Sequence, residues 1–189
     1  MSMPLKKRPF KGPPTLPQKV ARLERKVRRT TPDVQTYEFT QQLSGAAAGY
    51  NEYWINALGA SVVGDFSGDF FLESIHVRGD VVTDGGLRNA LRVDVIVPQA
   101  GQIPTPPLLT GVQNYADPKS YKTYISKSLV LNNGSPDAVL DLTKRLGLVV
   151  KSDGTIVSRN NAYIVVRWYN TNTTAPAVDI TWQVFAREK

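Results

Sequence analysis

The chain of 189 residues contains no cysteine and only one histidine. Without cysteine there can be no disulfide, thiolate nucleophile or cysteine metal site. The single histidine, His76, gives a zinc centre or a Ser-His-Asp triad too few partners, so we expect it to be a structural strand residue. There is also no apolar run of roughly eighteen residues, as a membrane span requires. An enzyme is therefore the poorest fit, and no membrane insertion is expected.

Acidic residues are almost missing from the first 29 positions. That segment holds one acid, Glu24, and ten of the chain's 23 lysines and arginines, a net charge of +9. The other 160 residues hold thirteen basic and fifteen acidic residues, a net charge of −2. A positive block separated in this way is typical of polyanion binding. The candidate nucleic-acid-binding residues are Lys6, Lys7, Arg8, Lys11, Lys19, Arg22, Arg25, Lys26, Arg28 and Arg29.

Proline interrupts the start of this basic segment. Residues 1–17 contain five prolines, which disfavour helix and central strand, so we expect a flexible or extended arm there. From Gln18 to Arg29, Val20, Leu23 and Val27 recur at helical spacing and predict a short helix. Twelve residues are marginal for an isolated helix in water. Phosphate contacts or neighbouring copies would therefore complete its folding.

After Pro32 the apolar period changes to two, which predicts β-strands. The clearest alternation predicts that Ile180, Trp182 and Val184 are buried and that Thr181 and Gln183 are less so. Strands are predicted at 34–43, 69–83, 91–99, 121–133, 138–142, 146–151, 161–170 and 178–187, with turns at 83–86, 132–135, 152–154 and 170–174. This pattern, without a long helix, favours a β-sandwich or barrel. The long proline-rich loop 98–120 is typical of a functional or interface-covering segment.

The remaining motifs each have an ordinary structural interpretation. Arg78–Asp80 spells the Arg-Gly-Asp integrin tripeptide, but it continues a β pattern rather than forming a loop tip. Asp65, Asp69 and Asp84 lie beside glycines and could hold calcium, yet a complete ligand loop is missing, so a turn role is favoured. The aromatic residues on strand positions could stack on bases, although core or subunit contacts are more typical: Tyr163, Trp168, Tyr169 and Trp182.

The order of segments is that of a small single jelly-roll capsid protein: a basic arm, a short basic helix and an all-β body. The stretch "FFLESIHVRGDVVT" (70–83) resembles an early strand of satellite tobacco necrosis-type coat proteins, which carries a similar His-Val-Arg-Gly run. "YISKSLVLN" (124–132) and "RLGLVVKSDG" (145–154) resemble later strands and a turn of that family. Capsids of small circular single-stranded DNA viruses resemble the same family.

This resemblance implies a fold and an assembly. Residues 33–189 would form an all-β, eight-stranded antiparallel jelly-roll sandwich as the shell domain. Residues 1–32 would form the basic, nucleic-acid-binding arm with its short helix. The chain would self-assemble into a T=1 icosahedral shell (roughly sixty copies) and package a single-stranded genome. Some members hold structural calcium at subunit interfaces, but no ligand residue can be transferred here, and no other cofactor is implied.

The implied partners are other copies of the chain and single-stranded nucleic acid, bound without sequence specificity. Whether that nucleic acid is DNA or RNA stays open, as does the host receptor. The implied location is the virion, with assembly in the host cytoplasm or nucleus. Lys6-Lys7-Arg8 could serve as a nuclear import signal.

Two other classes of protein fit the same pattern. One is a cellular nucleic-acid-binding β-domain that does not assemble into particles. The other is a jelly-roll lectin or similar ligand-binding module with a basic tail. Electron microscopy of purified protein separates the first from a capsid protein, because only a capsid protein gives uniform closed particles. Glycan binding that survives deletion of residues 1–29 would favour the second.

Overall fold

The computed structural model describes residues 33–44, 49–82, 89–99, 120–131, 137–170 and 177–189, together with Leu16, Pro17, Lys19 and Val20. The chain divides into two units, Met1–Asp33 and Val34–Lys189. In the first unit, Leu16, Pro17, Lys19 and Val20 are helical. The predicted helix began at Gln18, whereas Leu16 and Pro17 already lie in it. Proline is compatible with the first turn of a helix, because its missing N–H would have no partner there.

The second unit is almost entirely β-structure in its described part. Its strands are β1 (Gln35–Ser44), β2 (Gly49–Asn56), β3 (Phe70–Val82), β4 (Asn89–Pro98), β5 (Tyr121–Leu131), β6 (Asp137–Ser152), β7 (Val157–Arg159), β8 (Tyr163–Asn170) and β9 (Ala177–Glu188). One short helix, α2 (Ala60–Asp65), lies between β2 and β3. This confirms the all-β class predicted from the alternating pattern.

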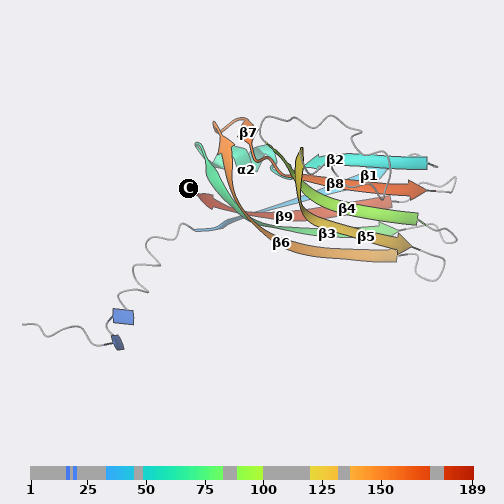
Figure 1. The fold of residues 1–189 in the computed structure, drawn as a ribbon, viewed down its shortest axis with the longest axis horizontal. Helices are drawn as coiled ribbons and strands as arrows, with labels where there is room; N and C mark the ends of the chain where they lie inside the picture. The colour runs from blue at the N-terminus through green and yellow to red at the C-terminus, as the bar shows by residue number, and fades with distance from the viewer. Residues whose placement is uncertain are drawn as a thin grey trace, which may run out of the picture. The chain divides into compact units, whose positions relative to one another are not determined.

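The strand order is that of a jelly roll. One sheet has the order β1-β9-β3-β6-β7 and the other has the order β2-β8-β4-β5 (Figure 1). If the short β7 is set aside, the first strand pairs with the last, the second with the one before it, and so on inward: β1 with β9, β2 with β8, β3 with β6 and β4 with β5. All these pairs are antiparallel. They form a long hairpin rolled into two facing four-stranded sheets, which is the eight-stranded jelly-roll topology.

The core lies between the two sheets, and β9 supplies its clearest example. Ile180 and Val184 are fully buried and Trp182 is 5% exposed, whereas Thr181 and Gln183 on the opposite face are only partly buried. The predicted orientation of this strand is therefore confirmed. Strict alternation fixes it, because successive strand side chains point to opposite faces of the sheet.

The largest difference from the predicted strands is β6. The sequence pattern predicted two strands, 138–142 and 146–151, but the structure has one strand of 16 residues. The polar run 143–145 stays in the strand because β3 pairs with it residue by residue across that run. A register shift at Leu72/Ser74 and a positive φ of 58° at Gly147 accommodate the irregularity. Cross-strand pairing thus overrides the local pattern.

The pattern also missed β2, α2 and the short β7. Strand β2 ("GYNEYWIN") does not alternate between apolar and polar residues. Its side chains are partly covered on both faces, with Tyr50 and Trp54 half-buried on one and Asn51 and Ile55 buried on the other. Alternation of apolar and polar residues marks a strand with one buried and one solvent-exposed face. A strand that is covered on both faces lacks this pattern and is therefore not predicted from it.

Candidate functional site

The arm holds the ten residues predicted to bind nucleic acid, and one of them is described. Lys19 lies in the helical stretch and its side chain is exposed, as a phosphate contact requires. The other nine lie outside the described residues: Lys6, Lys7, Arg8, Lys11, Arg22, Arg25, Lys26, Arg28 and Arg29. Their role as a nucleic-acid interface therefore stays a prediction from charge.

Several cations on the surface of the jelly roll are already paired with acids. Lys151 donates to Asp69 at 2.5 Å, and Lys189 approaches the same carboxylate oxygen at 3.3 Å. Lys151 lowers the pKa of Asp69, because its ammonium group stabilises the carboxylate. Arg187 forms an ion pair with Glu73. Each of these cations already contacts an acid of the domain, which makes it a weaker candidate for binding phosphate than a cation without such a contact.

Two further cations are buried on the outer face of the second sheet. Arg92 (2% exposed) donates through Nε to Asp94 Oδ1 at 3.1 Å, and the fully buried Arg167 donates to the other Asp94 oxygen. Arg92 also donates to the Ser126 hydroxyl at 2.6 Å. Burying charge is costly unless it is paired and hydrogen-bonded, and here Asp94 (3% exposed) pairs with both guanidinium groups. The sequence pattern did not indicate this network, since alternating polar residues suggest a solvent-facing side.

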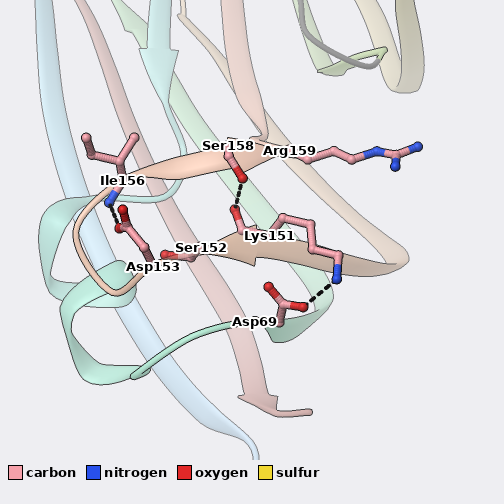
Figure 2. Close-up of a pocket in the computed structure, with 7 residues that line it drawn as sticks. All are labelled: Asp69, Lys151, Ser152, Asp153, Ile156, Ser158 and Arg159. Atoms are coloured by element: carbon pink, nitrogen blue, oxygen red, sulfur yellow. Dashed lines mark hydrogen bonds and ion pairs between the residues drawn. The ribbon is translucent and has the colours of Figure 1, made fainter.

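An open cavity with a volume of about 480 Å³ lies at the β6–β7 hairpin. Figure 2 shows Lys151 reaching toward Asp69 across it, while Asp153 turns back onto its own turn. Arg159, on β7, extends away from both carboxylates in this view. The cavity is lined by Asp69, Lys151, Ser152, Asp153, Ile156, Ser158 and Arg159.

The polar groups around Asp153 hold the hairpin turn rather than a substrate. Asp153 Oδ1 accepts hydrogen bonds from the Thr155 hydroxyl (2.7 Å) and from the backbone N–H groups of Thr155 (2.9 Å) and Ile156 (2.7 Å). These donors lower the pKa of Asp153 to about 2, the Thr155 side chain contributing most. Ser152 accepts from the Gly154 N–H at 3.0 Å, and Ser158 donates to the Lys151 carbonyl at 3.3 Å. No base is positioned to activate either serine within this described hairpin.

We predict that Asp153→Asn loosens this turn. Because the folded pKa is lowered, the charged carboxylate stabilises the turn above the unfolded pKa of about 3.9 and loses this effect as the pH falls through about 2. Nuclear magnetic resonance titration should give a midpoint near pH 2 for this group, and amide exchange at Thr155 and Ile156 should be faster in the variant. A midpoint at the ordinary aspartate value, with unchanged exchange, would contradict the assignment.

The carboxylates considered for calcium do not form a metal site in the described part of the chain. Asp69 is engaged by two lysines, as above, and Asp84 lies outside the described residues. Across the described ranges, no group of three or more His, Asp or Glu residues could hold a metal ion.

His76 and the Arg-Gly-Asp tripeptide lie together in the middle of β3. His76 Nε2 is 2.7 Å from Asp141 Oδ1, and Arg78 Nε is 3.9 Å from the other oxygen of that carboxylate. Gly79 faces the core, where a Cβ would lie 2.9 Å from the Ile180 side chain. The tripeptide is therefore paired on both sides in a sheet rather than exposed on a loop tip, as the β pattern predicted.

The tryptophans considered for base stacking belong to the core. Trp168 is 1% exposed and stacks on Tyr53 with ring centroids 5.1 Å apart. Trp182 stacks on Phe39 at 5.2 Å. Of the four aromatic residues singled out in the sequence, Tyr169 is the most exposed, at 50%. The core interpretation holds for both tryptophans.

Comparison with known proteins finds similar structures but no related sequence. No protein-family model and no curated protein matches the chain. Within the described residues, no helix has the length and apolar character needed to cross a membrane.

The structural likenesses include chains of plant virus structures. One is Desmodium yellow mottle tymovirus, with a TM-score of 0.48 and 13% identity over 96% of this chain and 95% of that one. Another is turnip yellow mosaic virus, with a TM-score of 0.47 and 14% identity over 84% and 94%. A third is broad bean stain virus, with a TM-score of 0.44 and 9% identity over 85% and 88%. The jelly-roll assignment here rests on strand order and register.

Proposed function

We propose that this chain is a viral capsid protein that self-assembles into a closed T=1 icosahedral shell and packages a single-stranded genome through its basic arm, residues 1–32. The separation of charge carries the proposal. Six basic side chains of the jelly roll are in ion pairs with its own acids. The first 29 residues, by contrast, hold a net charge of +9.

In this function the arm binds the genome. Its lysines and arginines neutralise phosphates and release the condensed counterions, which gives affinity without reading sequence. Either DNA or RNA satisfies that chemistry. Lys6-Lys7-Arg8 is in addition a candidate nuclear import signal, for the case in which assembly takes place in the host nucleus.

The jelly roll makes the wall of the shell and has no enzymatic role in this function. A domain of nearly neutral charge packs against copies of itself without strong repulsion. It also presents exposed apolar side chains suited to contacts between copies: Val139 (65% exposed), Ile156 (67%) and Tyr169 (50%). Stable contacts of this kind typically bury about 1,200–2,000 Å² in total.

Electron microscopy of the purified full-length protein is the direct test. Uniform closed particles that contain nucleic acid would support the proposal. A monodisperse monomer or dimer that binds nucleic acid would instead favour a cellular nucleic-acid-binding domain. Glycan binding by a variant that lacks residues 1–29, without particles, would favour a ligand-binding module.

We predict a steep salt dependence for binding of unassembled protein to single-stranded nucleic acid. Engagement of about 6–9 phosphates gives a log–log slope of roughly −4 to −6, at about 0.7 per contact. The slope is measured by fluorescence anisotropy over a sodium chloride series, with oligonucleotides of different sequence but equal length. Equal slopes are expected for all of them. A shallow slope with strong sequence preference would reject binding through the arm.

A further inference from the structure

One side of the jelly roll carries basic side chains that have no acidic partner among the described residues. Lys122 and Lys127 lie on β5, Lys144 on β6 and Arg159 on β7. All four are exposed, and none forms an ion pair with a described acid. We call these four residues the basic side. They contrast with the paired cations Arg78, Arg92, Lys151, Arg167, Arg187 and Lys189.

The register of the strands places the three lysines in an unusual position. Each lies opposite a buried apolar residue, and so on the face of its strand that is directed toward the core. The pairs are Lys122 with Val97, Lys127 with Val93, and Lys144 with Ile75. Strand β5 ends the second sheet, and β6 lies beside it at the border of the first (Figure 1). The lysines therefore line the opening between the two sheets along one side.

A cavity of about 270 Å³ lies at one end of this opening. Lys122, Tyr124, Arg159 and Asn160 are among the described residues that line it, and none of its described lining residues is a carboxylate. Lys122 Nζ lies 4.8 Å from the centre of the Tyr124 ring. Arg159 is directed away from Asp69 and Asp153 (Figure 2), so its guanidinium group is available on this side.

Asn160 holds the backbone turn beside the same cavity. Its φ of 62° lies in the left-handed region, which asparagine adopts more readily than most residues other than glycine. Its side-chain amide donates to the Val149 carbonyl at 2.7 Å, which holds it there.

We infer that the basic side binds the phosphate backbone of a single-stranded polynucleotide, as a second contact that does not depend on the arm. The inference deepens the proposed capsid function and rests on it for the identity of the polynucleotide. Lys122 and Lys127 are five residues apart on one strand, roughly 16 Å, too far for one small anion to bridge. The cavity is smaller than the ~300–1,000 Å³ of typical ligand sites and fits one group of a longer chain.

Protection of the sheet edge is the competing explanation. Inward-pointing charges on edge strands prevent pairing with other chains, and β5 and β6 are edge strands over much of their length. Protection accounts for the three lysines. It does not require Arg159 or a cavity whose described lining residues include no carboxylate. The two explanations differ in whether loss of these charges changes phosphate binding or only aggregation.

The experiment uses the full-length chain with all ten basic residues of the arm changed to Gln. Binding of a fluorescent deoxythymidine oligonucleotide is measured by anisotropy over a salt series. Four remaining phosphate contacts predict a slope of roughly −3, at about 0.7 per contact. Adding Lys122→Gln and Arg159→Gln should reduce it to about −1.4, and changing Lys127 and Lys144 as well should abolish binding. Lys→Arg changes at the three lysines should preserve the slope.

A matched control removes two cations from another face. Arg78→Gln with Arg145→Gln causes the same charge change on the outer face of the first sheet, at positions opposite Thr181 and Ser74. This pair should leave the slope unchanged, and circular dichroism should show that every variant is folded. Equal slopes in the control and test variants would overturn the inference. So would absence of oligonucleotide binding in the variant with a neutral arm.

Competing anions decide the source of the phosphate. A polynucleotide site is supported if inorganic phosphate displaces the oligonucleotide no more effectively than sodium chloride at the same ionic strength. The inference is overturned if the protein binds inorganic phosphate specifically but does not bind the oligonucleotide. It is also overturned if the protein binds heparin but not the oligonucleotide. Failure of the capsid proposal has a different signature. The wild-type protein would then form no closed particles, while the slopes of the neutral-arm variants still report on the basic side.

Discussion

Replacing Trp182 with alanine is expected to destabilise the jelly roll by about 3–5 kcal/mol and to abolish soluble assembly. Trp182 is 5% exposed on the inner face of β9, and its ring stacks on Phe39. Its indole Nε1 donates to the Ala57 carbonyl at 3.1 Å, so truncation also leaves that carbonyl without its partner. The cost combines lost apolar burial with a cavity that the two facing sheets can fill only in part.

Urea unfolding followed by circular dichroism measures this loss, and particle yield measures assembly. The matched control is Gln183→Ala on the next position of β9. Gln183 faces outward and donates to Glu38 at 2.8 Å in an exposed hydrogen bond, so a change within about 0.5 kcal/mol is expected. Wild-type stability and particle yield in Trp182→Ala would show that the orientation of β9 is wrong.

The alternating strands are the part of the fold that the sequence predicts well. In β9 and β4, apolar residues that face the core alternate with mostly polar residues on the other face. Such alternation allows only one orientation of the strand. The order of strands in the two sheets has no such local signal. It follows from pairings between residues far apart in the chain, such as Gln35 with Ala186, and only the resemblance to a known family predicted it.

The candidate site divides in the same way. The arm is visible in the sequence because its charges are contiguous, whereas the basic side joins residues from three separate strands. One signal was present: Lys127 occupies the same phase of β5 as Ile125, which is 9% exposed. A charged residue at a strand position where the alternation predicts an apolar one indicates either a sheet edge or a binding surface. The burial of the Arg92–Asp94 pair could not be predicted from the sequence, because polar residues that alternate with apolar ones normally indicate a solvent-exposed face.

The second large effect is expected from neutralising the arm. Changing the six basic residues between 19 and 29 to Gln should leave shells that form but lose most of their nucleic acid. The change keeps Val20, Leu23 and Val27, and glutamine is a fair helix former, so the predicted helix is retained. The jelly roll is a separate unit from Val34 onward, so the contacts proposed between copies would not require the arm's charge.

The ratio of absorbance at 260 nm to that at 280 nm in purified particles measures this loss. A charge-preserving control exchanges each of the same arginines for lysine and each lysine for arginine. It should package normally, because phosphate neutralisation depends on charge rather than on side-chain identity. Empty shells in both variants would mean that specific side chains bind the genome. Full packaging in the neutral variant would exclude the segment 19–29 as the main contact. The candidates would then be the four basic residues at the start of the arm, Lys6, Lys7, Arg8 and Lys11, and the basic side.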